Sequence, residues 1–151
     1  MATCNTDQLL ILVTRRHDLL AQLRDLGRLQ LQLVNDENLT DLLKVLAAKQ
    51  RLLGGLVPLE RALDAYRDEL PERRQWARAA DRQRCARLVD ECRAFLAEIV
   101  AGEQQSETLL TRHRDEISRR LNGAHAIQQA QGAYVADDVA TRGELDLSSQ
   151  C

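Results

Sequence analysis

The chain has 151 residues, of which 44% are hydrophobic and 29% are charged, the size and balance of one folded domain. Aromatic residues make up only 3%, so leucine and alanine must build the core, which favours helices over a β-sheet. The formal net charge of −2 gives no global attraction to nucleic acid or to anionic lipid.

Apolar residues at intervals of three and four predict a first helix over residues 6–34. Asn5 or Thr6 is expected to cap its N-terminus. A polar turn follows. Asn38, with Asp41 three residues later, resembles a capping box that opens the next helix.

The second helix is predicted over residues 38–70, although Gly54, Gly55 and Pro58 interrupt its leucine pattern. A proline in a helix clashes with the carbonyl group four residues earlier, and that residue is Gly54. Since glycine lets the backbone bend away, one helix with a kink is expected between Gly54 and Pro58. A true helix break is the alternative.

The third helix is predicted over residues 72–122, opening after Pro71 and ending at the stop signal Asn122 and Gly123. Residues 124–151 show no sustained period and are expected to form a flexible or partner-ordered tail. The predicted fold is therefore all-α: an elongated antiparallel three-helix bundle or coiled coil in residues 1–123, with a long third helix and a flexible C-terminal tail.

Helix lengths predict an uncovered surface. The first two helices are each about 45 Å long, whereas the third is about 75 Å long at 1.5 Å per residue. Only its part up to about Gln105 could be covered by the others. The apolar side chains beyond it then form a binding stripe, namely Leu109, Leu110, Ile117 and Leu121. A homodimer that buries the stripe, or a tail that folds back over it, are the alternatives.

The basic stretch after the second helix is a candidate nucleic-acid surface. Arg74, Arg78 and Arg82 would share one face of a helix, but Trp76 is the one aromatic platform there. A solvated arginine face, partly paired with acidic residues of the second helix, is the favoured interpretation. A small RNA-binding bundle is therefore disfavoured.

Reactive residues do not form a recognisable site in the sequence. None of the three histidines follows a glutamate by three residues, and no zinc, phosphate-loop or nucleophile-elbow motif is present. His113 lies on the predicted apolar stripe with Asp115 and Glu116 nearby, and a residue at the edge of the core is the favoured interpretation over a catalyst. We therefore expect a protein that is not an enzyme and that has no metal site and no cofactor.

Four cysteines are expected to be reduced thiols. Cys85 and Cys92 lie two helical turns apart, about 10 Å, which is too far for a disulfide, so both are predicted to be small core residues. Cys4 and Cys151 lie at the two ends of the sequence. No apolar run is long enough to span a bilayer, so a cytoplasmic protein without membrane insertion is expected.

A family resemblance rests on the order of these features. The segment LLKVLAAKQRLLGGLVPLERAL at residues 42–63 is followed by a long polar helix and by a tail with GAY and then ELDLS. This order resembles the FlgN-type flagellar export chaperones. The resemblance implies a small cytoplasmic all-α protein that protects the C-terminal segments of hook-associated proteins before type III export.

The same resemblance implies roles for particular residues. The client-facing positions would be Leu109, Leu110, Ile117 and Leu121, and Tyr134 in GAY would match the tail tyrosine that docks to the flagellar export gate. The expected partners are thus the C-terminal helices of hook-associated proteins and the export gate, with a homodimer also considered. The alternative function is a self-associating coiled-coil adaptor with no export role.

Overall fold

A computed structural model describes the backbone of residues 5–148 and the side chains of residues 5–139. Within these residues the chain is helical and contains no strand, which confirms the all-α prediction. A short 3₁₀ helix, η1, separates the second and third α-helices. The bounds of the elements are α1 Thr6–Asn35, α2 Leu39–Arg67, η1 Pro71–Arg73 and α3 Ala79–Ser148.

Asparagine side chains cap both helices of the first hairpin. The Asn5 side chain accepts hydrogen bonds from the backbone N–H groups of Asp7 and Gln8, at 3.0 and 3.4 Å. Asn38 accepts one from the N–H of Asp41 at 3.2 Å, and its amide also donates to the Asp41 carboxylate. Each cap satisfies helix donors that have no partner within the helix. Both predicted helix starts are therefore confirmed to within a residue.

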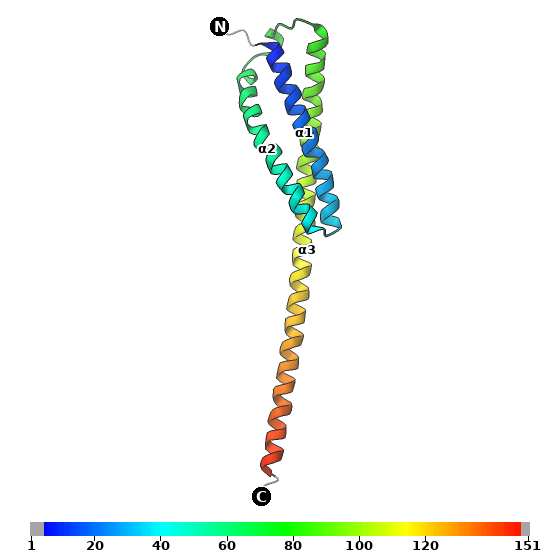
Figure 1. Ribbon diagram of the computed structural model, residues 1–151, viewed down its shortest axis with the longest axis vertical. Coiled ribbons are helices and arrows are strands. Elements are labelled where there is room, and N and C mark those ends of the chain that lie inside the picture. The colour runs from blue at the N-terminus through cyan, green and yellow to red at the C-terminus, as the bar shows by residue number, and fades with distance from the viewer. Residues whose placement is uncertain (1–4, 149–151) are drawn as a thin grey trace. The chain divides into compact units, whose positions relative to one another are not determined.

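Two compact units divide the chain between Leu109 and Leu110. In the first unit, α1 and α2 form an antiparallel hairpin, and the first part of α3 runs beside them in the direction of α1 (Figure 1). Three apolar clusters follow one another along this bundle: Leu9, Leu12, Val13, Leu63, Cys85 and Leu88; then Leu20, Leu23 and Cys92; and then Leu33, Val34, Leu42 and Val45. The predicted three-helix bundle is thus confirmed for this unit.

Cys85 and Cys92 are free and buried among leucines, as predicted. Burial raises the pKa of both thiols, which keeps them protonated and weakly nucleophilic. They therefore serve as small core residues. Cys4 and Cys151 lie outside the described residues.

The connection between α2 and α3 differs from the prediction. The second helix ends at Arg67 rather than at residue 70, and the third begins at Ala79 rather than at residue 72. Arg74 is extended, and its guanidinium donates to the backbone oxygen of Tyr66 at 2.7 Å, while Trp76 packs against the apolar cluster at this end of the bundle. These tertiary contacts outweigh helical propensity. The predicted single helical face of Arg74, Arg78 and Arg82 is therefore wrong.

One continuous helix runs through the glycine and proline positions of α2, so the helix break considered above is wrong. A Cβ atom added at Gly54 would meet no atom within 4 Å, and one added at Gly55 would meet only Leu19 Cδ1, at 3.8 Å. Internal packing therefore requires neither glycine. The kink near Pro58 stays a prediction.

The predicted end of the third helix at Asn122 and Gly123 is wrong, because α3 continues to Ser148. None of the described glycines has a positive φ, so Gly123 does not form the left-handed C-terminal cap that the sequence suggested. A glycine costs a helix only about 1 kcal/mol relative to alanine, and the following segment is rich in alanine and glutamine. The predicted tail is thus helical as far as Ser148, and its flexibility stays a prediction.

No helix among the described residues is both long enough and apolar enough to cross a lipid bilayer.

Candidate functional site

The second unit carries the predicted binding stripe on the later part of α3. Leu110, Ile117 and Leu121 are 37%, 56% and 66% exposed. Val135 and Val139 lie eighteen residues after Ile117 and Leu121, a spacing of five helical turns at 3.6 residues per turn. These five side chains, which we call the distal stripe, therefore share one face of the helix. Every described side chain from residue 114 to residue 139 is exposed.

Leu109 was predicted to be part of this stripe, and that prediction is wrong. Its side chain is half-buried and packs against the cluster of Leu33, Val34, Leu42 and Val45 in the first unit. Because α3 begins at Ala79 and not at residue 72, its covered part extends further along the sequence than Gln105. Leu109 therefore belongs to the core of the bundle.

Tyr134 also lies on α3, where its side chain is 79% exposed. With Ile127 and Val135 it lines a shallow apolar patch. This patch adds to the apolar surface of the second unit. The structure therefore presents Tyr134 to solvent on a helix, whereas the sequence placed it in an irregular tail.

A polar layer interrupts the apolar core of the first unit. Lys49, on α2, donates from Nζ to the Gln30 side-chain oxygen on α1 at 2.6 Å and forms an ion pair with Glu103 on α3. Burial lowers the pKa of the Lys49 ammonium group. Ser106 is also buried here, and its hydroxyl has no hydrogen-bond partner among the described residues. One such layer ties all three helices together in register.

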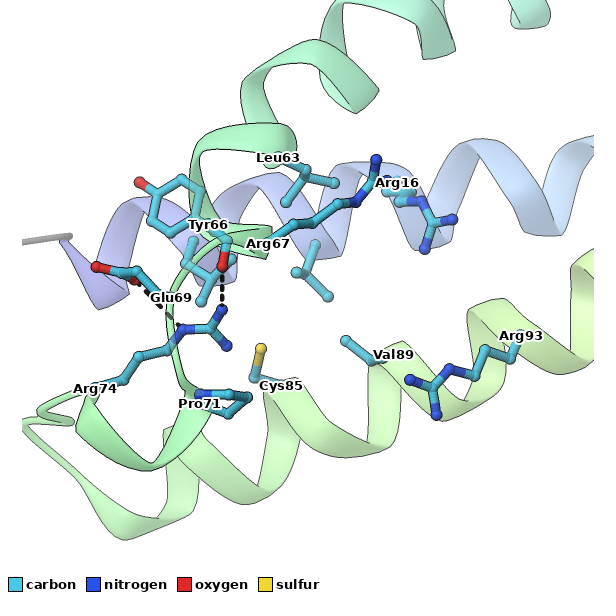
Figure 2. A pocket seen from close by; sticks show the side chains of 12 residues that line it. Arg16, Leu63, Tyr66, Arg67, Glu69, Pro71, Arg74, Cys85, Val89 and Arg93 are labelled. Carbon is cyan, nitrogen blue, oxygen red and sulfur yellow. Dashed lines mark hydrogen bonds and ion pairs between the residues drawn. The ribbon is translucent and has the colours of Figure 1, made fainter.

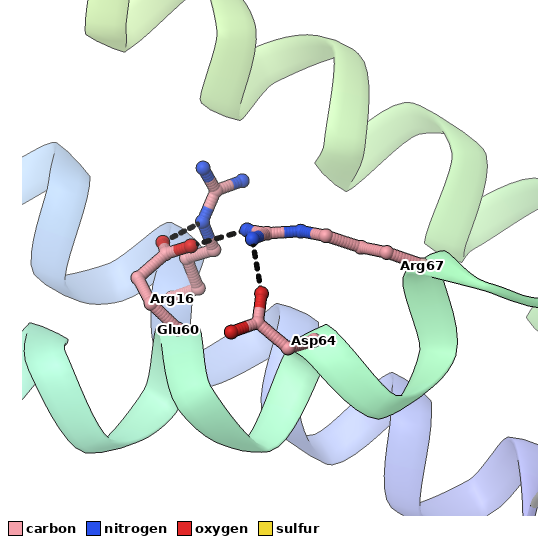
Figure 3. Close-up of polar contacts among 4 residues, drawn as sticks. All are labelled: Arg16, Glu60, Asp64 and Arg67. Atoms are coloured by element: carbon pink, nitrogen blue, oxygen red, sulfur yellow. Dashed lines mark hydrogen bonds and ion pairs between the residues drawn. The ribbon is translucent and has the colours of Figure 1, made fainter.

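Ionic contacts join α1 to α2 near the other end of the bundle, where Glu60 lies between two arginines (Figure 3). Its carboxylate accepts hydrogen bonds from Arg16 on α1 and from Arg67 on α2, and Arg67 also donates to Asp64 at 2.5 Å. Burial alone would raise the pKa of Glu60, but the hydrogen bonds and charges of both arginines outweigh burial and hold that pKa below its ordinary value. Glu60 is therefore a structural carboxylate and is not suited to accept a proton near neutral pH.

A pocket of about 440 Å³, which no sequence pattern indicated, lies beside this cluster (Figure 2). Its floor is apolar and includes Cys85, and its lining contains four arginines from distant parts of the chain: Arg16, Arg67, Arg74 and Arg93. Each guanidinium already has a carboxylate beside it, namely Glu60, Asp64, Glu69 or Asp90. The positive charge is thus compensated, and these contacts close the end of the bundle.

Within the described part of the chain, no three His, Cys, Asp or Glu side chains come together as a metal site would require. His17 pairs with Glu91 at 2.6 Å and lies against the Phe95 ring, which fixes α1 to α3. Of the sequence-predicted site residues, the structure places Leu110, Ile117, Leu121 and Tyr134 on exposed helix and assigns Leu109 to the core.

Comparisons of the chain with protein-family models, with curated proteins and with solved structures found no match.

Proposed function

We propose that this protein is a cytoplasmic export chaperone. It binds the C-terminal helical segments of flagellar hook-associated proteins and delivers them to the flagellar type III export apparatus. The observation that carries this function is the exposed distal stripe on a helix whose earlier part belongs to a well-packed bundle. The resemblance of residues 42–63 and of the GAY segment to FlgN-type chaperones supports a hook-associated protein as the client.

The chemistry of the stripe favours an amphipathic helix as the client. Leucine, isoleucine and valine side chains at helical spacing offer apolar anchors but no group that could recognise a charged or polar ligand specifically. An isolated helix of this kind is only marginally stable in water, because tertiary packing provides most of the stability of helices. A client helix that covers the stripe would therefore stabilise both partners.

Isothermal titration calorimetry tests this function with the full chain and the C-terminal helical segment of a hook-associated protein. The double variant Ile117→Ser/Leu121→Ser should weaken binding by about 2 to 4 kcal/mol, roughly 30-fold to 1000-fold, because it removes two anchors. The matched control is Ile11→Ser/Leu29→Ser, which changes two exposed apolar side chains of α1 and should bind like the wild type.

Thermal unfolding of two variants distinguishes the client site from the core of the bundle. Ile117→Ser/Leu121→Ser should leave the thermal unfolding of the bundle unchanged, whereas Leu109→Ser should lower its midpoint because Leu109 packs on the core. A double variant that binds the segment like the wild type would show that the distal stripe is not the client site. A wild-type chain that does not bind any such segment would refute the proposed client.

Tyr134 provides a separate test of the proposed delivery of the client to the export gate. Tyr134 is exposed but is not one of the five residues of the distal stripe, so Tyr134→Ala should leave client binding largely intact and should weaken capture by the purified export-gate protein. Unchanged capture would remove Tyr134 from the docking step while leaving the client site in place.

The alternative function is a self-associating adaptor with no export role. The observation that favours it is a second exposed apolar face, which lies on α2.

A further inference from the structure

The second helix carries apolar residues on a face that the bundle does not bury. Positions 39, 43, 46, 50, 53 and 57 follow one another at alternating intervals of four and three residues. Five of these residues are large and apolar, and they are between 41% and 67% exposed; the sixth is Gln50. We call these positions the α2 seam: Leu39, Leu43, Leu46, Gln50, Leu53 and Val57. The core face of α2 is separate and buries Leu42, Val45, Lys49 and Leu63.

Alternation of four and three residues is the heptad spacing of a coiled coil. In heptad terms, Leu39, Leu46 and Leu53 occupy d positions, and Leu43, Gln50 and Val57 occupy a positions. A helix face that only met solvent would not be expected to carry large apolar residues at five of six successive heptad positions. The seam therefore has the pattern of a helix that packs against a further helix.

We propose that the α2 seam is a homodimer interface in which α2 of a second copy packs antiparallel against it. With a two-fold axis beside residue 48, Leu39 faces Val57 of the second copy, and Leu43 faces Leu53. Leu46 faces Gln50 in the central layers. All six positions find a partner in this one register, as a self-complementary two-fold interface requires. The two Gln50 side chains lie in the neighbouring central layers, so this register keeps the polar residues of the seam together at its centre.

Residues beside the seam favour a second copy over a charged partner helix. The flanking e positions are Thr40, Ala47 and Gly54, which are small, exposed and uncharged. In the antiparallel register, Ala47 lies opposite its own counterpart, and Thr40 lies opposite Gly54 of the second copy. No like charges meet along this edge, and the two backbones can approach closely.

Gly54 supports this close approach. It has an ordinary helical conformation without a positive φ, and a Cβ atom there would meet no atom of the chain within 4 Å. Glycine in a helix interior is unfavourable relative to alanine, so its presence needs a reason. A neighbouring helix from a second copy is one, in addition to relief of the Pro58 clash.

A charge-reversal experiment tests the interface and its register together. The mass of the full chain is measured by light scattering or sedimentation over a concentration series, where the wild type should form a dimer. L43E and L53K should each weaken dimerisation at least about tenfold, because each introduces a charge into the apolar layers. The double variant L43E/L53K should recover most of the affinity, because each glutamate then faces a lysine of the second copy.

Residues 43 and 53 are too far apart along α2 to interact within one chain, so recovery reports contact between copies. The matched control is L29K, on α1, because Leu29 is 41% exposed and Leu53 is 42% exposed. L29K should dimerise like the wild type. The fluorescence of Trp76, which packs on the core, confirms that each variant is folded.

A cross-linking measurement covers the case in which a charged variant unfolds. In a chain with Cys4 and Cys151 changed to serine, A47C should form a disulfide-linked dimer under mild oxidation, because the two-fold axis passes close to residue 47. A94C, at an exposed alanine of α3, should not. Equal cross-linking of both variants would overturn the interface.

Three further results would overturn it as well. The first is a wild-type chain that stays monomeric over the whole series, which would leave the seam to a helix of another protein. The second is a dimer that persists in L43E and L53K but dissociates in Ile117→Ser/Leu121→Ser, which would place self-association on the distal stripe. The third is a double variant that stays as monomeric as the single ones, which excludes the antiparallel register. The seam and the distal stripe lie on different helices, so either proposal can fail alone.

Discussion

Replacing Lys49 with methionine should lower the free energy of unfolding by about 1 to 3 kcal/mol, although methionine is apolar and of similar length. The Lys49 side chain is 9% exposed, and its ammonium group is the donor to the buried oxygen of Gln30. Without Lys49, that oxygen stays buried without its partner, which causes most of the loss. Glu103 is 48% exposed and can turn to water, so its share is small.

Gln30→Leu should cost a similar amount, because it leaves the buried Lys49 ammonium with Glu103 as its remaining partner. The double variant Lys49→Met/Gln30→Leu removes both polar groups from the layer and should lie within about 1 kcal/mol of the wild type. Urea unfolding, followed by the fluorescence of Trp76, the single tryptophan of the chain, measures all three variants. Losses that simply add in the double variant would refute a coupled Gln30–Lys49 pair.

Three further variants test other parts of the fold. Pro58→Ala should raise the unfolding free energy by up to about 3 kcal/mol in urea titrations, because it restores a helical N–H and removes a clash within α2; a clear loss would show that packing needs the proline. Ser106→Ala should raise it by about 1 kcal/mol, because the buried hydroxyl has no partner among the described residues, and a destabilised variant would reveal one. Glu60 has a pKa below its ordinary value of 4.5, so its contribution is present above that pH and is lost as pH falls through the folded pKa. The wild type should therefore lose more stability than Glu60→Gln on acidification, and parallel pH profiles would contradict this.

Sequence periodicity predicted the first hairpin closely, because its signals are local. The apolar spacing defined α1 to within one residue, and Asn5 and Asn38 cap the helices that their positions indicated. Local caps act within one turn, so they can be recognised without the rest of the fold. The same spacing identified Cys85 and Cys92 as core residues.

The connection before α3 could not be predicted in this way, since distant contacts determine it. Arg74 is held by the backbone of Tyr66, and the Thr6 hydroxyl donates to the backbone oxygen of Gln75 at 3.1 Å. No periodic pattern encodes such contacts. The later start of α3 that results also moved Leu109 from the predicted stripe into the core.

The prediction of where α3 ends was wrong for a different reason. An Asn-Gly pair is a frequent stop signal, but a C-terminal cap requires a left-handed residue, and Gly123 remains helical. The candidate site was predicted in part: Leu110, Ile117 and Leu121 are exposed as expected. The arginine-lined pocket was missed because its four arginines meet only when three helices and their connection pack together.

The two units should differ in how readily their helices open, because one is exposed and the other has a buried core. Residues 110–139 have no intramolecular core of their own, so their helix should open readily in the free protein. The buried clusters of the bundle should protect their amides from exchange whether or not a client is present.

Amide hydrogen exchange of the full chain, with and without the C-terminal helical segment of a hook-associated protein, tests client binding most directly. We expect exchange in residues 110–139 to be fast in the free protein and to slow at least about tenfold on binding, while exchange in the bundle stays nearly unchanged. Protection that appears in the bundle, or that is absent from residues 110–139 when the segment is bound, would contradict a client site on the distal stripe.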